Sequence, residues 1–296
     1  MEEKIGIVTR GINNIYTVVE KDLFLTEDDS PQCMCRIKGK VLNQKRDEYS
    51  PLAVGDYVKY VLHTPKEGLI LERLERKNTF QRWNAKKSLN QTIVANMDLI
   101  VIVTSTDEPP FRPRFIDRAI VCAGITPVLI GLNKCDLLLT EEEDERFTLF
   151  KTLGYETINM SAFDEKGIAL LKTYIDHKKV AFVGQSGVGK STSVNALQPH
   201  LDLDTLEISE YSGKGQHTTT FAEMHPLRFG GHIIDSPGIK MLSYNHMEIM
   251  DVAHNFREFF HYSSECKFGD CTHSNEPKCA VKKAIELGEI SELRYL

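Results

Sequence analysis

The sequence predicts a multidomain protein with a small β-barrel at the amino terminus, a central α/β domain and a small helical domain at the carboxy terminus. Three observations support this fold class. Residues 1–76 alternate short β-rich runs with turn residues. From Asp98 onward, apolar runs alternate with segments of helix length, which is typical of a parallel sheet with helices on both faces. After Pro237 the strand pattern stops, and two helical segments flank a group of cysteines.

The composition excludes several classes of protein. Hydrophobic residues make up 41% of the 296 residues and charged residues 26%, which argues against long disorder and against a rod. The longest nearly apolar stretch, residues 119–132, is too short for the roughly 20 residues that cross a bilayer. The amino terminus lacks the basic and apolar regions of a secretory signal. We therefore expect a cytoplasmic protein that does not bind membranes, and in the absence of any sign of an obligate dimer we expect a monomer.

The amino-terminal region has six short runs with strand character, at residues 4–9, 15–19, 23–25, 33–37, 56–62 and 68–74. The net charge of −6 gives no general attraction to nucleic acid, so any such contact must be local. Arg36, Lys38 and Lys40 lie on or beside one run and would suit an oligonucleotide-binding face, with a solvated basic face as the alternative. Residues 77–96 are polar and basic with little periodicity, which suits a linker or a loop laid over a neighbouring domain.

The remaining elements alternate along the chain. Strands are expected at residues 99–104, 126–132, 156–159, 180–183 and 232–234. Helices are expected at residues 114–123, 141–153, 166–175, 248–261 and 279–286. We place the domain bounds at 1–76 for the barrel, 77–96 for the linker, 97–243 for the central domain and 244–296 for the carboxy-terminal domain.

A phosphate-binding loop is the strongest local signal. The segment Gly184-Gln-Ser-Gly-Val-Gly-Lys-Ser191 matches G-x-x-x-x-G-K-S, and it follows a strand and precedes a helix, as this motif requires. Backbone N–H groups would surround the phosphates, Lys190 would stabilise their charge and Ser191 would bind Mg²⁺. The candidate phosphate-binding residues are Gly184, Gln185, Ser186, Gly187, Val188, Gly189, Lys190, Ser191 and Thr192. The alternative is a chance glycine-rich turn.

A second element, Asp235-Ser-Pro-Gly238, follows the run at 232–234. Asp235 would reach the Mg²⁺ shell, and the N–H of Gly238 would face the γ-phosphate.

Two further motifs indicate which base is bound. Asn133-Lys134-Cys135-Asp136 ends a predicted strand, and Asp136 can accept hydrogen bonds from N1–H and the 2-amino group of guanine. Adenine cannot make this pair of bonds, so GTP is favoured over ATP and an ATP-using kinase is disfavoured. Asn159-Met-Ser-Ala162 follows another strand and would offer Ser161 and the N–H of Ala162 to the base.

The order of these motifs is unusual. In an ordinary small GTPase the phosphate loop comes first, whereas here the base-binding motifs at 133–136 and 159–162 precede it. This order predicts a circular permutation of the GTPase fold, which is tolerated where chain ends lie close together at the surface.

Near the carboxy terminus, Cys266, Cys271, His273 and Cys279 supply three thiolates and one imidazole within 14 residues. This is the ligand set of one closed, tetrahedral structural zinc site. The alternatives are free thiols and a set in which His261 replaces His273. A reducing compartment argues against disulfides.

The permuted order, the loop Gly215-Gln-His-Thr-Thr-Thr220 and the Cys/His tail together resemble the RsgA family of bacterial, ribosome-associated, circularly permuted GTPases. The resemblance covers nearly the whole chain. It implies an OB-fold barrel that contacts RNA, a GTPase domain and a zinc domain. It also implies that the partner is the 30S ribosomal subunit with its 16S rRNA, in late assembly.

The resemblance also bears on the hydrolytic step. Ras-like enzymes orient the attacking water with a Gln after D-x-x-G, but Ile239 occupies that position here. His217 is the candidate for this catalytic role, because the family's G-K/R-H-T-T motif is similar; a structural or RNA-facing histidine is the alternative. Gln216 departs from the basic residue that is common there. Thr218 or Thr219 is expected to bind Mg²⁺ with Ser191 and Asp235.

We therefore expect a zinc-containing GTPase that hydrolyses GTP to GDP and phosphate with Mg²⁺, and that leaves the 30S subunit on hydrolysis. The alternative is a GTP-gated RNA-binding switch with negligible chemistry of its own.

Overall fold

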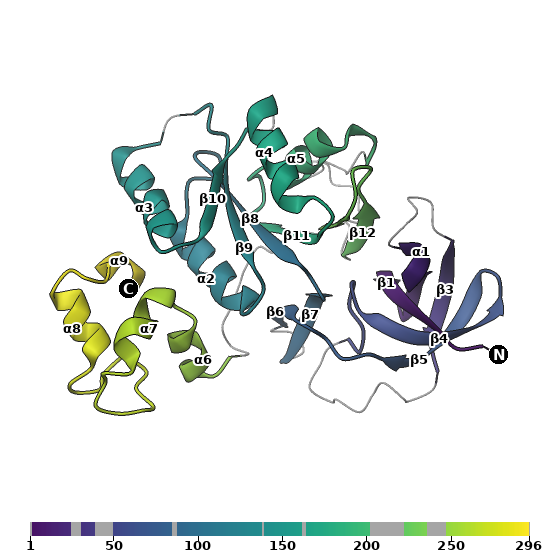
Figure 1. Ribbon diagram of the computed structural model, residues 1–296, viewed down its shortest axis with the longest axis horizontal. Helices are drawn as coiled ribbons and strands as arrows, with labels where there is room; N and C mark the ends of the chain where they lie inside the picture. The colour runs from purple at the N-terminus through teal and green to yellow at the C-terminus, as the bar shows by residue number, and fades with distance from the viewer. Residues whose placement is uncertain are drawn as a thin grey trace, which may run out of the picture.

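The computed structural model describes residues 2–24, 31–38, 50–84, 88–137, 139–161, 164–201, 222–235 and 247–295. A β-barrel and a group of short helices lie at opposite ends of a central sheet that is flanked by helices (Figure 1). None of the helices in these ranges is long and apolar enough to span a membrane.

The barrel is built from β1 (Lys4–Ile12), β2 (Ile15–Glu20), β3 (Gln32–Ile37), β4 (Tyr57–Thr64) and β5 (Glu67–Arg73). The strands pair in the order β1-β2-β3-β5-β4, and β4 pairs with β1 to close the barrel. Alternate side chains fill the interior, including Val8, Cys35 and Ile70, which are fully buried. The predicted OB-fold barrel is confirmed.

One expected strand is wrong. Residues 21–24 form a single helical turn, α1 (Lys21–Phe24), where a strand was expected at 23–25. The side chain of Phe24 stacks on the ring of His232 in the central domain, with ring centroids 3.7 Å apart. Three apolar residues are too few for their spacing to distinguish a strand from a helical turn, and this tertiary contact fixes the conformation.

The segment 77–96, expected to be a linker or a loop laid over a neighbouring domain, contains two paired strands of a hairpin. The strands are β6 (Thr79–Asn84) and β7 (Leu89–Ala95), which are antiparallel. Phe80 and Val94 pair across the two strands and are buried against the central domain. Most of the surrounding residues are polar or basic, so the few apolar side chains of the buried face give little periodicity in the sequence.

The central sheet has the order β10-β9-β8-β11-β13-β12. Its strands are β8 (Leu99–Ser105), β9 (Val128–Asn133), β10 (Glu156–Asn159), β11 (Lys179–Gly184), β12 (Glu223–Pro226) and β13 (His232–Asp235). The first five in spatial order are parallel and β12, which the sequence did not predict, is antiparallel to β13. At the far edge β12 pairs with β1 of the barrel, where Arg10 and Glu223 face each other.

Helices cover both faces of this sheet, as predicted. Ile100 and Ile102 of β8 pack with α2 (Pro113–Ala123) and α3 (Glu141–Thr152). Val101 and Val103 of the same strand pack with α4 (Glu165–Ile175) and α5 (Lys190–Leu197) on the opposite face. A short 3₁₀ turn, Pro199–Leu201, follows α5. Because successive strand side chains point to opposite faces, an uninterrupted apolar strand is what a sheet covered on both sides needs.

The carboxy-terminal part contains α6 (Ile249–His254), α7 (Arg257–Ser263), α8 (Ala280–Glu286) and α9 (Glu292–Tyr295). The single helix expected at 248–261 is divided in two, because Phe256 adopts an extended conformation and caps α7. Arg294 of α9 forms hydrogen bonds with Glu258 and with Asp117 of α2, so this part is tied to the central domain.

Candidate nucleotide-binding site and metal centre

The sequence motifs meet at one edge of the central sheet. The parallel strands β9, β10, β11 and β13 end at Asn133, Asn159, Gly184 and Asp235, so each motif begins where a strand ends. The carboxyl ends of parallel strands share an edge, and in open α/β sheets ligands bind at that edge.

The phosphate loop joins β11 to α5 through left-handed backbone. Gly187 and Gly189 have φ values of +82° and +90°, in a region that residues other than glycine rarely adopt. A Cβ atom at Gly189 would lie 2.2 Å from Nδ2 of Asn133, and one at Gly184 would lie 2.5 Å from the carbonyl oxygen of Val103. Space therefore requires glycine at positions 184 and 189, and the left-handed backbone favours it at 187 and 189. The loop leads into the amino-terminal end of α5, where N–H groups and the helix dipole favour an anion.

Lys190 is held inside the curve of this loop. Its side chain is buried, and its Nζ donates to the carbonyl oxygens of Gly184 and Gln185 at 3.0 and 2.7 Å. These bonds fix a positive charge beside the loop amides. Ser191 and Thr192 follow Lys190 in the chain and lie half-buried on the first turn of α5.

A hydrogen bond joins the base-binding turn, residues 133–136, to the phosphate loop. Nδ2 of Asn133 donates to the carbonyl oxygen of Val188 at 2.8 Å. The N–H of Cys135 donates to the carbonyl oxygen of Met160 at 3.3 Å, which brings the turn to the end of β10 beside the buried Ser161. The carboxylate of Asp136 is exposed. The two base-binding motifs therefore lie side by side, with an acceptor open to a ligand.

Asp235 ends β13, the strand next to β11, so its carboxylate and the Ser191 hydroxyl come from neighbouring elements. Both are oxygen donors of the kind that Mg²⁺ prefers. The remaining candidates lie outside the described residues: Ala162, His217, Thr218, Thr219 and Gly238. Their roles stay predictions.

The structure adds one segment that no motif marks. Residues 105–109 run from the last residue of β8, the strand between β9 and β11, and they contact the base-binding turn. Thr106 Oγ1 donates to the carbonyl oxygen of Lys134 at 2.9 Å, and Nζ of Lys134 donates to the carbonyl oxygens of Asp107 and Glu108. Only the spatial order of the strands could have drawn attention to this segment.

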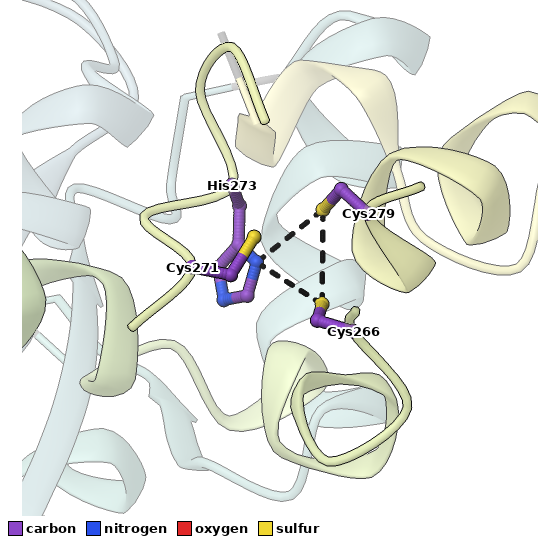
Figure 2. A group of neighbouring side chains, drawn as sticks. All are labelled: Cys266, Cys271, His273 and Cys279. Carbon is purple, nitrogen blue, oxygen red and sulfur yellow. Dashed lines mark hydrogen bonds between the residues drawn. The ribbon is translucent and has the colours of Figure 1, made fainter. Parts of the chain in front are cut away.

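The four proposed metal ligands come together between α7 and α8 (Figure 2). Their ligand atoms all lie within 4.8 Å of one another. Nδ1 of His273 is 3.4 Å from Sγ of Cys279 and 3.7 Å from Sγ of Cys266, and these two sulfur atoms are 3.9 Å apart. A tetrahedral zinc ion with Zn–S of about 2.3 Å and Zn–N of about 2.0 Å has edges of roughly 3.5–3.8 Å. The residues therefore fit one metal ion.

The surroundings of the cluster orient its ligands. Ser263 Oγ lies 3.4 Å from Nε2 of His273, and the N–H of Ala280 donates to Sγ of Cys266 at 3.3 Å. Burial alone would raise the pKa of the Cys266 thiol, but hydrogen bonds from the N–H groups of Ala280 and Val281 and with the neighbouring cysteine thiols outweigh it, and the pKa is lowered. A lowered thiol pKa favours the thiolate, which is the metal-binding form. Among the described residues His273, and not His261, belongs to the cluster.

Comparisons with known proteins agree with this arrangement. Residues 73–245 match the model of the RsgA GTPase family, a stretch that includes the β6–β7 hairpin. A protein of Flavobacterium psychrophilum described as "Small ribosomal subunit biogenesis GTPase RsgA" is 40% identical, over 98% of this chain and 90% of its own length. One of Flavobacterium johnsoniae with the same description is 42% identical over the same shares.

Two solved structures are similar over almost the whole chain. The crystal structure of YjeQ from Thermotoga maritima is 30% identical, with a TM-score of 0.74 over 99% of this chain and 95% of that one. The structure of YloQ, described as a circularly permuted GTPase, is 29% identical, with a TM-score of 0.70 over 99% and 92%. The family match covers more than half of the chain, and the relatives cover nearly all of it. The chain therefore belongs to the RsgA GTPase family and is a GTPase, a hydrolase that acts on GTP.

Proposed function

We propose that this protein binds the small ribosomal subunit in the cytoplasm during late 30S maturation, hydrolyses GTP to GDP and phosphate there, and is released on hydrolysis. The observation that carries the nucleotide assignment is the hydrogen bond between Asn133 and Val188, which joins the base-binding turn to the phosphate loop in one site. The ribosomal assignment is supported by the names of the relatives.

Guanine is recognised by Asp136, with Ser161 and the N–H of Ala162 beside it. The loop from Gly184 to Gly189 surrounds the phosphates, and Lys190 stabilises charge that develops on the β and γ oxygens. Ser191, Asp235 and one of Thr218 and Thr219 hold Mg²⁺, which neutralises phosphate charge when bound.

His217 orients the attacking water. The water oxygen bonds to the γ-phosphorus while the bond from that phosphorus to the bridging oxygen breaks, which leaves GDP, phosphate and a proton. The N–H of Gly238 faces the γ-phosphate.

The cluster of three cysteines and His273 holds one zinc ion, since thiolates with an imidazole in a tetrahedral set select zinc. Three of the four ligands are buried, so the ion has a structural role and leaves no position for a substrate. It joins the end of α7 to the start of α8.

The barrel supplies an RNA-binding face. Arg36 and Lys38 are exposed at the end of β3, and Met34 on the same strand is 56% exposed. A positively charged face that follows the phosphate backbone is one requirement of single-stranded RNA binding, and the flexible thioether of Met34 adds apolar surface beside it. We propose that this face contacts 16S rRNA. Lys40 lies outside the described residues.

The test is GTP hydrolysis with and without purified 30S subunits, run beside ATP. We expect the subunits to stimulate hydrolysis of GTP and not of ATP, and His217→Ala to remove the stimulation. His177→Ala is the matched control, because His177 is exposed on the turn before β11, at the opposite end of that strand from the phosphate loop.

Two outcomes would contradict the proposal. If 30S subunits leave the rate of GTP hydrolysis unchanged while GTP binding is intact, the ribosomal assignment fails. Loss of nucleotide-dependent subunit binding in His217→Ala, with hydrolysis unchanged, would instead favour a GTP-gated RNA-binding switch.

A further inference from the structure

The segment from Ser105 to Pro109 lies between the two halves of the nucleotide site. On one side it contacts the turn Asn133–Asp136, through Thr106 and the backbone of Asp107 and Glu108. On the other side Cδ of Pro109 lies 3.3 Å from the position that a Cβ on Gly187 would take. The segment is closed on itself by a 2.6 Å hydrogen bond from Ser105 Oγ to the carbonyl oxygen of Pro109. It therefore contacts the phosphate loop and the base-binding turn together.

Thr106 contacts the turn with both its side chain and its backbone. It is 5% exposed, and its Oγ1 donates to the carbonyl oxygen of Lys134 at 2.9 Å. Its N–H also donates to the carbonyl oxygen of Asn133 at 3.4 Å. Two successive carbonyl groups of the turn are thus held by one residue.

The turn needs such support because of its backbone. Lys134 has a φ of +61°, in the left-handed region that residues other than glycine adopt only when their surroundings hold them there. Asp136 follows two residues later, so the direction of its carboxylate depends on the conformation at Lys134. Nζ of Lys134 donates hydrogen bonds to the carbonyl oxygens of Asp107 and Glu108. The turn and the segment are therefore joined by hydrogen bonds from side chains of both.

We propose that Thr106 is a positioning residue for guanine selection, whose hydroxyl holds the turn so that Asp136 faces both N1–H and the 2-amino group of the base. The proposal rests on the proposed role of Asp136 in guanine binding. In this role Thr106 acts on the base indirectly, through Lys134. The Lys134 carbonyl oxygen accepts from the Thr106 hydroxyl and, at 2.9 Å, from the N–H of Leu137 within the turn. Removing the hydroxyl takes away the donor that ties this carbonyl to the Ser105–Pro109 segment, and this loosens the direction of the Asp136 carboxylate.

The test compares dissociation of fluorescent N-methylanthraniloyl GDP and IDP from the full chain by stopped flow. Inosine lacks the 2-amino group, so it makes only the N1–H bond with Asp136. In Thr106→Val, which keeps the shape and removes the hydroxyl, we expect GDP to dissociate about tenfold faster, a change that corresponds to about 1.4 kcal/mol. IDP dissociation should be affected less, so the ratio of the IDP rate to the GDP rate falls.

Two variants control for shape and burial. Thr106→Ser restores the hydroxyl and should restore the ratio. Thr104→Val makes the same exchange at a buried threonine of β8, two residues earlier in the chain, whose partner in the sheet is Leu132, and it should leave the ratio unchanged. If Thr106→Val does not fold, the ratio is measured on Thr106→Ala.

Asp136→Asn separates this inference from the function on which it rests. It should remove the preference for GDP over IDP. Suppose that it does. The role of Thr106 is then overturned, while the base site stands, if Thr106→Val has the same rate ratio as the unmodified protein or accelerates the dissociation of GDP and IDP by the same factor. If Asp136→Asn leaves the ratio unchanged, the proposed guanine site fails and the inference fails with it.

Discussion

Gly189 shows how one missing side chain shapes the nucleotide site. It adopts a φ of +90°, caps α5, and gives Nδ2 of Asn133 room to reach Val188. A Cβ atom there would meet Nδ2 at 2.2 Å, so the Asn133 amide would have to leave its hydrogen bond with the loop. The phosphate loop and the base-binding turn are therefore held together only when residue 189 is glycine.

Gly189→Ala is expected to weaken GDP binding at least tenfold and to lower the free energy of unfolding by about 2–3 kcal/mol, because backbone strain adds to the broken contact. Equilibrium titration with a fluorescent GDP and urea unfolding measure the two effects. Gly124→Ala is the matched control: Gly124 also has a positive φ, of +55°, but a Cβ there meets nothing within 4 Å. It should lower stability by about 1 kcal/mol without changing affinity. Equal affinities in the two variants would show that the clash does not matter.

At the scale of elements, the barrel is attached to the strand that carries Asp235. Phe24 of α1 stacks on His232, which begins β13, and Nζ of Lys179 in β11 donates to the hydroxyl of Tyr57 in β4 at 2.9 Å. Burial, with a smaller contribution from the charge of Lys179, lowers the pKa of His232 to about 4. The imidazole is therefore held neutral at this junction.

Acidification is expected to weaken the junction. An unfolded His titrates near pH 6.5, so between about pH 6.5 and pH 4 the unfolded chain binds a proton that the folded chain excludes. The stabilisation is complete above about pH 6.5 and is lost as the pH falls toward 4, by about 3 kcal/mol at 1.36 kcal/mol per pKa unit. Urea unfolding at several pH values, monitored with a probe in the barrel, should show this loss of stability. His232→Phe should flatten it and the exposed His177→Phe should not. If the free energy of unfolding of His232→Phe depends on pH as steeply as that of the unmodified protein, the pH dependence belongs to other groups.

The elements also show what local sequence can predict. The phosphate loop, the Asn133–Asp136 turn and the Cys/His cluster each depend on residues close together in the chain, so their spacing is visible in the sequence. The β6–β7 hairpin packs through a few side chains such as Phe80 and Val94, and α1 through the stacking of Phe24 against a strand about 200 residues away in the chain. Thr106 meets Lys134 across 28 positions, a contact that only the strand order creates. Long-range contacts of single side chains leave no periodic pattern to read.

At the scale of the whole molecule, the helices at the carboxy terminus form a separate structural unit with a small core. Its buried apolar residues are few, among them Phe259, Val281 and Ile290, and the metal ligands lie within the same cluster. Its attachment to the central domain includes Arg294, whose side chain is 4% exposed between Asp117 and Glu258. The nucleotide site, in contrast, is built from loops after β8, β9, β11 and β13, and none of its described residues belongs to this unit.

Removal of the metal should therefore unfold this unit and spare the nucleotide site. Zinc binding to such ligand sets supplies on the order of 10 kcal/mol of apparent folding energy, more than so small a core provides. We expect about one zinc ion per purified chain. Chelation, or Cys279→Ser, should make residues 247–295 sensitive to protease while GDP affinity changes less than about twofold. His261→Ala should keep the ion, because His261 is exposed and lies outside the cluster. If chelation weakened GDP binding as strongly as Gly189→Ala does, the carboxy-terminal unit and the nucleotide site would be energetically coupled. Arg294 would then be the first contact to examine, because it joins α9 to α2, the helix that follows β8 and its Thr106 segment.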